Sequence, residues 1–218
     1  MERMTLFIGN KNYSSWSLRP WLVLKHAGAT FEEKLIPLDQ PDTAARIAQV
    51  NPAGRVPALL HGDQVIWDSL AICEYANELF PKAQLWPQDA KARAWARSVS
   101  AEMHSGFQAM REHLPMKMKE SIHLDRIPPE AQANIDRIRA SWTELRRRHA
   151  AAGPYLFGGF SIADAMYAPV VSRFRTYGVP VDGVVAAYCE TVWAHPAMQA
   201  WRSGAEAEML RMARYDKA

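Results

Sequence analysis

The apolar positions of the chain follow two different periods, with the change near residue 80. In the first part, short apolar or alternating runs are separated by helical patterns and by turn residues. The pattern predicts strands at 5–9, 31–38, 56–62 and 64–68, and helices at 17–28, 42–50 and 69–80. The order is therefore βαβαββα, an α+β unit of about eighty residues.

The second part has only the helical period. The expected helices cover residues 90–114, 128–153, 161–178, 181–195 and 195–210, with glycines or prolines between them. Pro81 and Pro87 interrupt both periods between the two parts. We therefore predict an α+β domain at residues 1–80, a linker at 81–88 and an all-helical domain at 89–218.

Composition excludes several classes of function. Of the 218 residues, 49% are hydrophobic and 22% charged, with a net charge of only +3. The one short basic run, Arg146–Arg148, is typical of a solvated helix face, so we expect no nucleic-acid partner. No stretch approaches the ~18–20 apolar residues of a membrane span, and the N-terminus lacks a signal-peptide pattern. We expect a cytoplasmic protein without a membrane partner.

The cysteines and common motifs point away from metal and disulfide chemistry. Cys73 and Cys189 stand far apart, so each is expected to be a small buried apolar residue in a reducing compartment. The sequence has no phosphate loop, HExxH, GxSxG or EF-hand pattern. We therefore expect no metal site and no serine-hydrolase triad.

Hydroxyl groups gather where the first strand meets the first helix. NKNYSSWSLRPW (residues 10–21) places Tyr13, Ser14, Ser15 and Ser17 at this junction. Such residues cap the free N–H groups of a helix. Alternatively, they hold an anion or a thiolate at the helix N-terminus, because both the hydroxyl hydrogen and the helix dipole stabilise negative charge.

Two further segments allow either a structural or a ligand-binding interpretation. In NPAGRVPALL (residues 51–60), Pro57 either starts a strand or forms a cis bond that presents the Val56 backbone to a peptide-like ligand. In WDSLAICEYANELF (residues 67–80), Asp68 and Ser69 either cap the next helix or bind the ammonium and carboxylate of an amino acid.

The helical part contributes weaker signals. Met103, Phe107 and Met110 have the spacing of residues on one face of a helix, which indicates either a core position or the wall of a cleft. His104 and Arg111 lie beside them in the sequence. Arg173 and Arg175 either bind an acidic substrate group or are solvated. Ser161 and Asp164 form a capping-box pattern, which we interpret as structural.

Taken together, these segments resemble the cytosolic glutathione transferase superfamily over essentially the whole chain. The matches are YSSWSLRPW after the first strand, NPAGRVPALL, WDSLAICEYANELFP and FSIADAMYAPV, in that order. The first of them looks most like the zeta class, whose signature is Ser-Ser-Cys-Ser-x-Arg. The resemblance implies a thioredoxin-like N-terminal domain, a helical C-terminal domain, glutathione as co-substrate and a homodimer.

The resemblance also implies roles for individual residues. It makes Ser14 the first candidate for the donor to the glutathione sulfur, with Ser15 second and Tyr13 third. Val56, cis to Pro57, is expected to pair with the cysteinyl part, and Asp68 and Ser69 with the γ-glutamyl end. The remaining implied residues are Trp16, Gln40 and Arg55 for glutathione, and Met103, His104, Phe107, Met110, Arg111, Arg173 and Arg175 for the second substrate.

One position departs from the zeta signature. Trp16 stands where the signature has cysteine, which puts the isomerase activity in doubt and makes disulfide or quinone reduction a poor expectation. We expect a transferase that activates the glutathione thiolate for conjugation of a small electrophile, with isomerisation through an adduct as a variant. The alternative is a non-catalytic protein of this fold that binds apolar ligands or protein partners.

Overall fold

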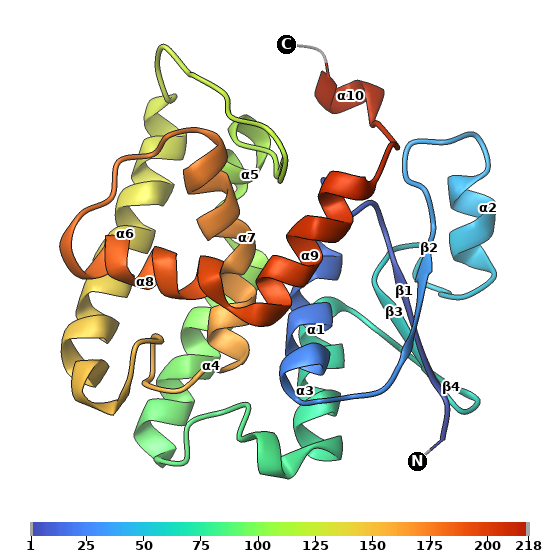
Figure 1. Cartoon of the computed structure of the whole chain (residues 1–218), viewed down its shortest axis with the longest axis horizontal. Helices are drawn as coiled ribbons and strands as arrows, with labels where there is room; N and C mark the ends of the chain where they lie inside the picture. Colours follow the sequence, from blue (N-terminus) through green and yellow to red (C-terminus); the bar gives the residue numbers. More distant parts are fainter. Residues whose placement is uncertain (1, 217–218) are drawn as a thin grey trace.

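The computed structural model describes residues 2–216, and its first part is built on a mixed four-stranded sheet (Figure 1). The strand order is β2-β1-β3-β4, with β1 parallel to β2 and antiparallel to β3, and β3 antiparallel to β4. The central strand β1 is almost wholly buried, as its apolar sequence MTLFI predicts. The strands are β1 (Met4–Ile8), β2 (Glu32–Leu35), β3 (Ala58–His61) and β4 (Gln64–Trp67).

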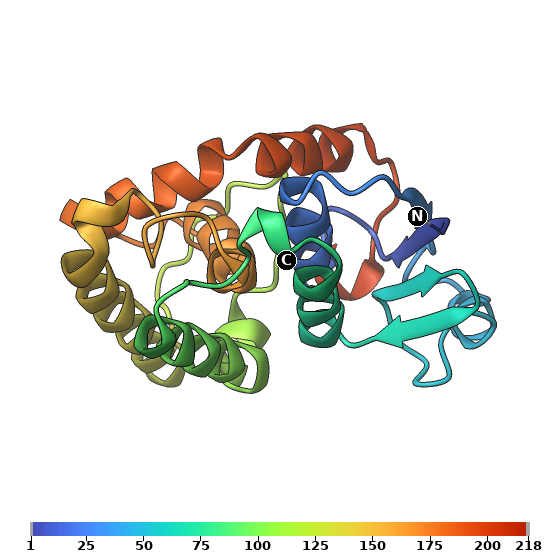
Figure 2. The ribbon, with the colours of Figure 1, turned by 90° about the horizontal axis from the view of Figure 1, so that it is seen from below.

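Three helices accompany the sheet and complete the predicted βαβαββα order. They are α1 (Ser15–His26), α2 (Thr43–Ala48) and α3 (Ser69–Leu79). Helices α1 and α3 lie between the sheet and the helical part, whereas α2 lies on the other side of the sheet (Figures 1 and 2). The predicted thioredoxin-like architecture is therefore confirmed, with shorter elements than the periodicity suggested.

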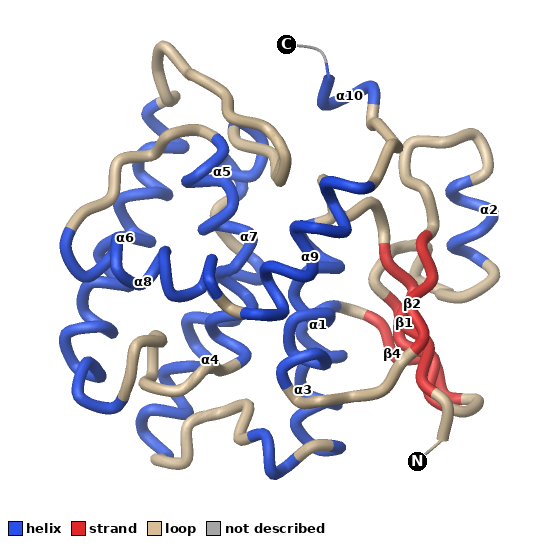
Figure 3. Tube along the Cα trace, viewed as in Figure 1, coloured by secondary structure: helices blue, strands red, loops and turns tan. Residues whose placement is uncertain are grey.

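The second part is all helical, and the strands are confined to the first part (Figure 3). The short 3₁₀ helix η1 (Pro81–Ala83) follows α3, and η2 (Ala150–Ala152) follows α6. The α-helices are α4 (Ala90–Ser105), α5 (Gln108–His113), α6 (Pro129–His149), α7 (Ile162–Thr176), α8 (Gly183–Ala194), α9 (Pro196–Ala207) and α10 (Ala213–Asp216).

Helix α7 lies at the centre of the molecule. All but one of its residues are buried, and it packs against α1, α4 and α8. Its N-terminus has the predicted capping box: Asp164 accepts hydrogen bonds from the backbone N–H of Ser161 at 2.8 Å and of Leu156 at 3.0 Å. Burial raises the pKa of the Asp164 carboxyl to about 6. The structural interpretation of this motif is confirmed.

Two helix boundaries differ from the sequence prediction. The helix expected over 90–114 is broken between α4 and α5, because Gly106 is extended and Phe107 adopts a left-handed conformation with φ of 60°. The helix expected to run to residue 210 ends at Ala207, and a short α10 follows it. Local periodicity does not show the break at residues 106–107, because the helical spacing of apolar residues continues across it. The end of a helix is likewise not fixed by periodicity to within a few residues.

Cys73 and Cys189 are both free and buried, as expected. Within residues 2–216, no helix combines the length and apolar character that crossing a membrane requires. Over the same residues, His, Cys, Asp and Glu side chains do not form a group of three or more that could hold a metal ion.

Candidate active site

The serine-rich junction folds into a tight turn that starts α1. Ser14 is the N-cap residue: its Oγ accepts a hydrogen bond from the Ser17 backbone N–H at 3.4 Å and donates to Ser17 Oγ at 2.8 Å. Ser17 Oγ in turn accepts from the backbone N–H of Gly9 at 3.1 Å, which ties the helix start to the end of β1. The Ser14 hydroxyl therefore has the capping role that the sequence allowed, and the Ser17 hydroxyl links the start of the helix to β1.

Ser15 makes a different contact. Its Oγ accepts a hydrogen bond of 3.4 Å from Arg173 Nη2, which reaches it from α7. The Arg173 side chain is buried, and the acceptors of its other hydrogen bonds are the carbonyls of Leu114 and Pro169 at 2.8 and 3.2 Å. The Ser15 hydroxyl hydrogen is thus not used in the helix cap and lies next to a cation.

The loop before β3 places a backbone segment beside these serines. Asn51 organises this loop: its Nδ2 donates to the Arg55 carbonyl at 2.5 Å, and its Oδ1 accepts from the Ala53 backbone N–H at 2.9 Å. The bond between Val56 and Pro57 is cis, as the family resemblance implied. Asn51 was absent from the sequence-predicted site, although its place at the start of NPAGRVP was the available signal.

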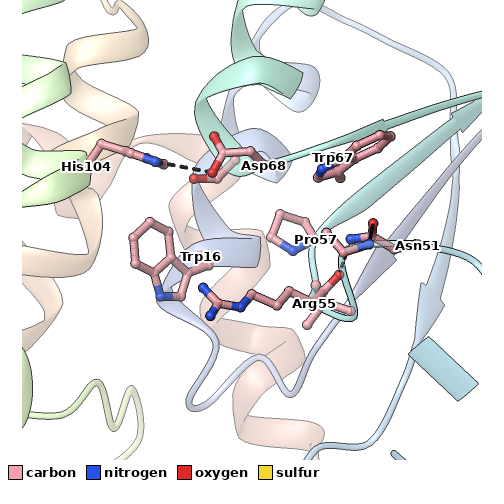
Figure 4. Close-up of a pocket in the computed structure, with 10 residues that line it drawn as sticks. Trp16, Asn51, Arg55, Pro57, Trp67, Asp68 and His104 are labelled. Carbon is pink, nitrogen blue, oxygen red and sulfur yellow. Dashed lines mark hydrogen bonds and ion pairs between the residues drawn. The ribbon is translucent and has the colours of Figure 1, made fainter. Parts of the chain in front are cut away.

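Asp68 and Ser69 begin α3 and face a cavity. Asp68 has a φ of 75°, and its Oδ1 accepts hydrogen bonds from the backbone N–H of Leu70 at 2.8 Å and of Ala71 at 3.3 Å. Its Oδ2 lies 3.2 Å from Nε2 of His104, which reaches across from α4 (Figure 4). Ser69 Oγ is buried and has no hydrogen-bond partner in the described part of the chain. Ser69 also lines this cavity.

Two cavities meet along the boundary between the sheet domain and the helical domain. The first has a volume of about 480 Å³ and is lined by residues of the loop before β3, of β4, of the α3 N-terminus and by His104. The second, of about 220 Å³, is lined by Ser14 and Ser15, by Arg111 and Arg173, and by the C-terminal residues Met212 and Tyr215. Trp16 and Val56 line both cavities, so the two cavities adjoin at these residues.

Trp16 stands between the cavities, in contact with a group of cations. The guanidinium of Arg19 lies 4.3 Å from the Trp16 ring centroid and that of Arg111 lies 4.9 Å from it. The His104 ring meets the Trp16 ring edge-on at 5.3 Å between centroids (Figure 4). Cation–π contacts of this kind stabilise the arrangement and fix the indole where the zeta signature has a cysteine.

Several of the predicted residues lie together in these cavities. The first cavity contains Trp16, Arg55, Val56, Pro57, Asp68, Ser69 and His104, and the second contains Tyr13, Ser14, Ser15, Arg111 and Arg173. His104 thus lies on the side where glutathione was expected rather than on the second-substrate side. Its pKa is lowered, chiefly by burial, while the Asp68 carboxylate opposes that shift.

Other predicted residues lie outside both cavities. Met103 and Met110 are fully buried in the helical core, as is most of Phe107, so the wall-of-a-cleft interpretation does not describe them. Arg175 forms a 2.6 Å ion pair with Glu190 on the surface and stacks over Trp193. Gln40 is exposed beside α2, where its Nε2 donates to the Leu38 carbonyl at 3.4 Å.

Sequence reasoning also missed functional candidates besides Asn51. Arg19 follows the serines in the quoted segment, and an arginine within the apolar run LRPWLVL is a signal that could have been used. Met212 and Tyr215 reach the second cavity from a segment with no motif, and Tyr215 stacks on Tyr13 with 5.8 Å between ring centroids. Nothing in their local sequence indicates that contact.

Comparisons with known proteins agree with this geometry. Residues 13–79 match the glutathione S-transferase N-terminal domain family, and residues 128–205 match the C-terminal domain family. Glutathione S-transferase 1 of Dianthus caryophyllus is 31% identical over 182 residues, covering 82% of this chain and 80% of that protein. The chain belongs to the glutathione S-transferase family.

The relatives of this transferase-family chain come from more than one class. A probable maleylacetoacetate isomerase of Caenorhabditis elegans is 38% identical over 109 residues, which cover half of each chain. A Burkholderia glutathione transferase homolog, solved with bound glutathione, is 26% identical with a TM-score of 0.74 over 95% of this chain and 100% of that one. The superfamily assignment is confirmed, whereas membership of the zeta class stays a prediction.

Proposed function

We propose that this glutathione S-transferase family member binds glutathione across the two cavities and activates its thiol for attack on a small electrophile. One observation carries the proposal: the N-termini of α1 and α3, each bearing serine hydroxyls, open on adjoining cavities that share Trp16 and Val56. Two helix N-termini suit a ligand with a carboxylate at one end and a thiolate further along.

The glutathione backbone fits the first cavity. The γ-glutamyl carboxylate is proposed to accept hydrogen bonds from the α3 N-terminus and from the partnerless Ser69 hydroxyl. Asp68 is the proposed partner of the ammonium group, although its oxygens already contact the helix N–H groups and His104. Arg55 is proposed for the glycine carboxylate. The homolog solved with bound glutathione supports glutathione as the ligand.

The thiol is proposed to lie at the start of α1. Only the thiolate is a good nucleophile, and a free thiol has a pKa near ~8.5, so the site has to favour the ionised form. The Ser15 hydroxyl, the dipole of α1 and the nearby Arg173 guanidinium all stabilise negative charge there. Because the Ser14 hydroxyl is engaged in the helix cap, we propose Ser15 as the principal donor to the sulfur.

The chemistry that follows is a substitution or an addition at the electrophilic atom of the second substrate. The thiolate forms the new carbon–sulfur bond, and in a substitution the leaving group departs with its electron pair. The second cavity, which adjoins the serines, is where the electrophile would be held. The homodimer implied by the resemblance and the cytoplasmic location expected from the sequence also stay predictions.

Calorimetric titration with glutathione and with S-hexylglutathione near neutral pH tests the proposal. We expect both to bind, with the alkyl conjugate tighter because its chain enters the second cavity. Turnover of an aryl halide with glutathione should then be saturable in both substrates. If neither ligand binds, the motif serves only the fold and the proposal is wrong. If both bind without any turnover, the chain is a glutathione-binding protein rather than an enzyme.

A further inference from the structure

Three arginine side chains are packed next to the second cavity, and none of them is hydrogen-bonded to a carboxylate among the side chains that the structure describes. Arg19 and Arg173 are buried, and Arg111 is partly buried. None of the guanidinium nitrogens of Arg19 has a hydrogen-bond partner in the described part of the chain, and neither does Nη1 of Arg111. A buried guanidinium normally donates to acceptors, so this group of cations is incomplete as it stands.

The contacts that these arginines do make are all with neutral groups. Arg111 donates from Nε to the Gly106 carbonyl at 3.0 Å and from Nη2 to the Met103 carbonyl. Arg173 donates to two backbone carbonyls and to the Ser15 hydroxyl, as described above. Among the side chains that the structure describes, no carboxylate hydrogen-bonds to any of the three. The guanidinium groups are therefore held by neutral groups, and the Asp68 carboxylate acts on Arg19 without a hydrogen bond.

The cations repel one another, which strengthens the case for an anion. Burial lowers the pKa of Arg173 to about 9, with a further contribution from the charge of Arg111. Burial likewise lowers the pKa of Arg111 to about 10. Burial and the charges of both neighbours lower the pKa of Arg19, while the charge of Asp68 opposes this shift in part. An anion within hydrogen-bond reach would relieve this repulsion, and paired guanidinium N–H groups fit a carboxylate in particular.

The lining of the second cavity shows where such an anion fits. Arg111 and Arg173 both line it, from α5 and α7, and the lining residues that the structure describes include no aspartate or glutamate. Arg19 lies beneath the Trp16 ring and adds its charge without reaching the cavity wall. Under the proposed placement, both carboxylates of glutathione lie in the first cavity. The thiolate at Ser15 is the one negative charge that glutathione brings to the second cavity, next to Arg173. A further anion, within reach of Arg111 as well, would then come from the other substrate.

We propose that the second cavity selects electrophiles that carry a carboxylate, which Arg111 and Arg173 bind while the adjacent electrophilic atom faces the thiolate at Ser15. The inference rests on the proposed glutathione-dependent function and names its substrate class. The structure thus favours small acidic electrophiles over the neutral apolar ones that a purely hydrophobic pocket would accept.

A pair of glutathione conjugates of equal length tests the subsite by binding alone. S-(5-carboxypentyl)glutathione and S-hexylglutathione differ only in the group at the end of the chain. The carboxylate form should bind the unmodified protein about tenfold more tightly, which corresponds to about 1.4 kcal/mol. Equal or weaker binding of the carboxylate form overturns the subsite but leaves the glutathione site intact. Failure of both conjugates and of glutathione overturns the proposed function itself.

Variants assign the effect to the cavity arginines. Arg111→Met and Arg173→Gln should each bring the affinity ratio of the two conjugates close to one. The matched control is Arg175→Met, because Arg175 lies two residues along the same helix but pairs with Glu190 outside both cavities. It should keep the tenfold ratio. If Arg111→Met does not fold, Arg111→Lys retains the charge and should reduce the ratio only in part.

Turnover gives an independent readout. 4-Chloro-3-nitrobenzoate and its methyl ester react with thiolate by the same substitution: the carbon–sulfur bond forms and chloride leaves with the bonding electron pair. With each kcat/KM divided by the rate constant of the uncatalysed reaction with glutathione, the acid should be preferred about tenfold. An enzyme that prefers the ester after this correction contradicts the proposal.

Discussion

Ser14 and Ser15 are neighbours on the chain, yet their hydroxyl groups make different contacts. Ser14 exchanges hydrogen bonds with Ser17 at the start of α1, whereas Ser15 Oγ accepts only from Arg173 among the contacts that the structure shows for it. The sequence ranked Ser14 first because the family signature begins with that residue. The structure shows why the ranking needs a test: a hydroxyl already used for capping is a poorer donor to a second acceptor.

The thiol pKa of bound glutathione distinguishes the two serines. Ser15→Ala removes the proposed donor to the sulfur and should raise this pKa by about one or two units. Ser14→Ala should change the thiol pKa less but lower the free energy of unfolding by about 0.5–2 kcal/mol, because it removes a helix cap. The thiolate absorbance near 240 nm as a function of pH, together with urea unfolding, measures both. A larger pKa change in Ser14→Ala would return the role to Ser14.

Residue-level patterns predicted part of the site and could not have predicted the rest. Asp68 was recognisable because helix capping leaves a local signature, and its capping hydrogen bonds are present in the structure. Arg19 was not recognisable as a partnerless cation, because the groups that surround a guanidinium come from elements distant in the chain. Burial without a partner is a property of the tertiary structure, and no spacing of residue types encodes it.

The break between α4 and α5 shows the corresponding limit at the scale of elements. Met103, Phe107 and Met110 keep the helical period through the break, so the pattern predicted one helix over residues 90–114. Gly106 was the only local sign of an interruption. At the break, the backbone carbonyls of Met103 and Gly106 both accept hydrogen bonds from the Arg111 side chain. The break therefore positions a residue of the proposed carboxylate subsite.

Gly106→Ala tests this link between an element boundary and the site. A Cβ atom at residue 106 would lie 2.8 Å from the backbone oxygen of Glu102, too close to fit without a backbone shift. We expect a loss of about 1–3 kcal/mol in the free energy of unfolding and a smaller preference for the carboxylate conjugate. Gly159→Ala is the control, since a Cβ there meets nothing within 4 Å. Unaltered ligand preference in a destabilised Gly106→Ala protein would show that the break is purely structural.

The two domains are joined by α9, which lies against α1 of the sheet domain (Figure 1). Trp201 on this helix donates from Nε1 to the Lys11 carbonyl at 2.9 Å. At its N-terminus, His195 Nδ1 accepts from the Ala197 backbone N–H at 3.2 Å, and His195 Nε2 lies 3.1 Å from Nδ1 of His26 on α1. Periodicity predicted the helix, but no local pattern of residues indicates this contact between domains.

The histidine contact should make the stability of the whole molecule depend on pH. Because Nδ1 of His195 accepts from the helix, its Nε2 carries the proton and donates to His26, which requires both rings to be neutral. Burial lowers the pKa of His195 to about 4, with a contribution from His26, and burial also lowers the pKa of His26. The unfolded chain therefore binds more protons below about pH 6.5, and stability falls as the pH drops from there towards 4.

His195→Asn separates this effect from other titrating groups. Asparagine keeps a capping side chain but cannot titrate, so the loss of stability between pH 7 and pH 5 should be smaller than in the unmodified protein by about 1–2 kcal/mol. Asp164, whose raised pKa gives the opposite dependence, is present in both proteins and does not affect the difference. His123→Asn, at a side chain that is 91% exposed, is the control and should retain the full loss. Urea unfolding at the two pH values measures all three, and an equal loss in His195→Asn would mean that acid weakens the molecule elsewhere than at the contact between its domains.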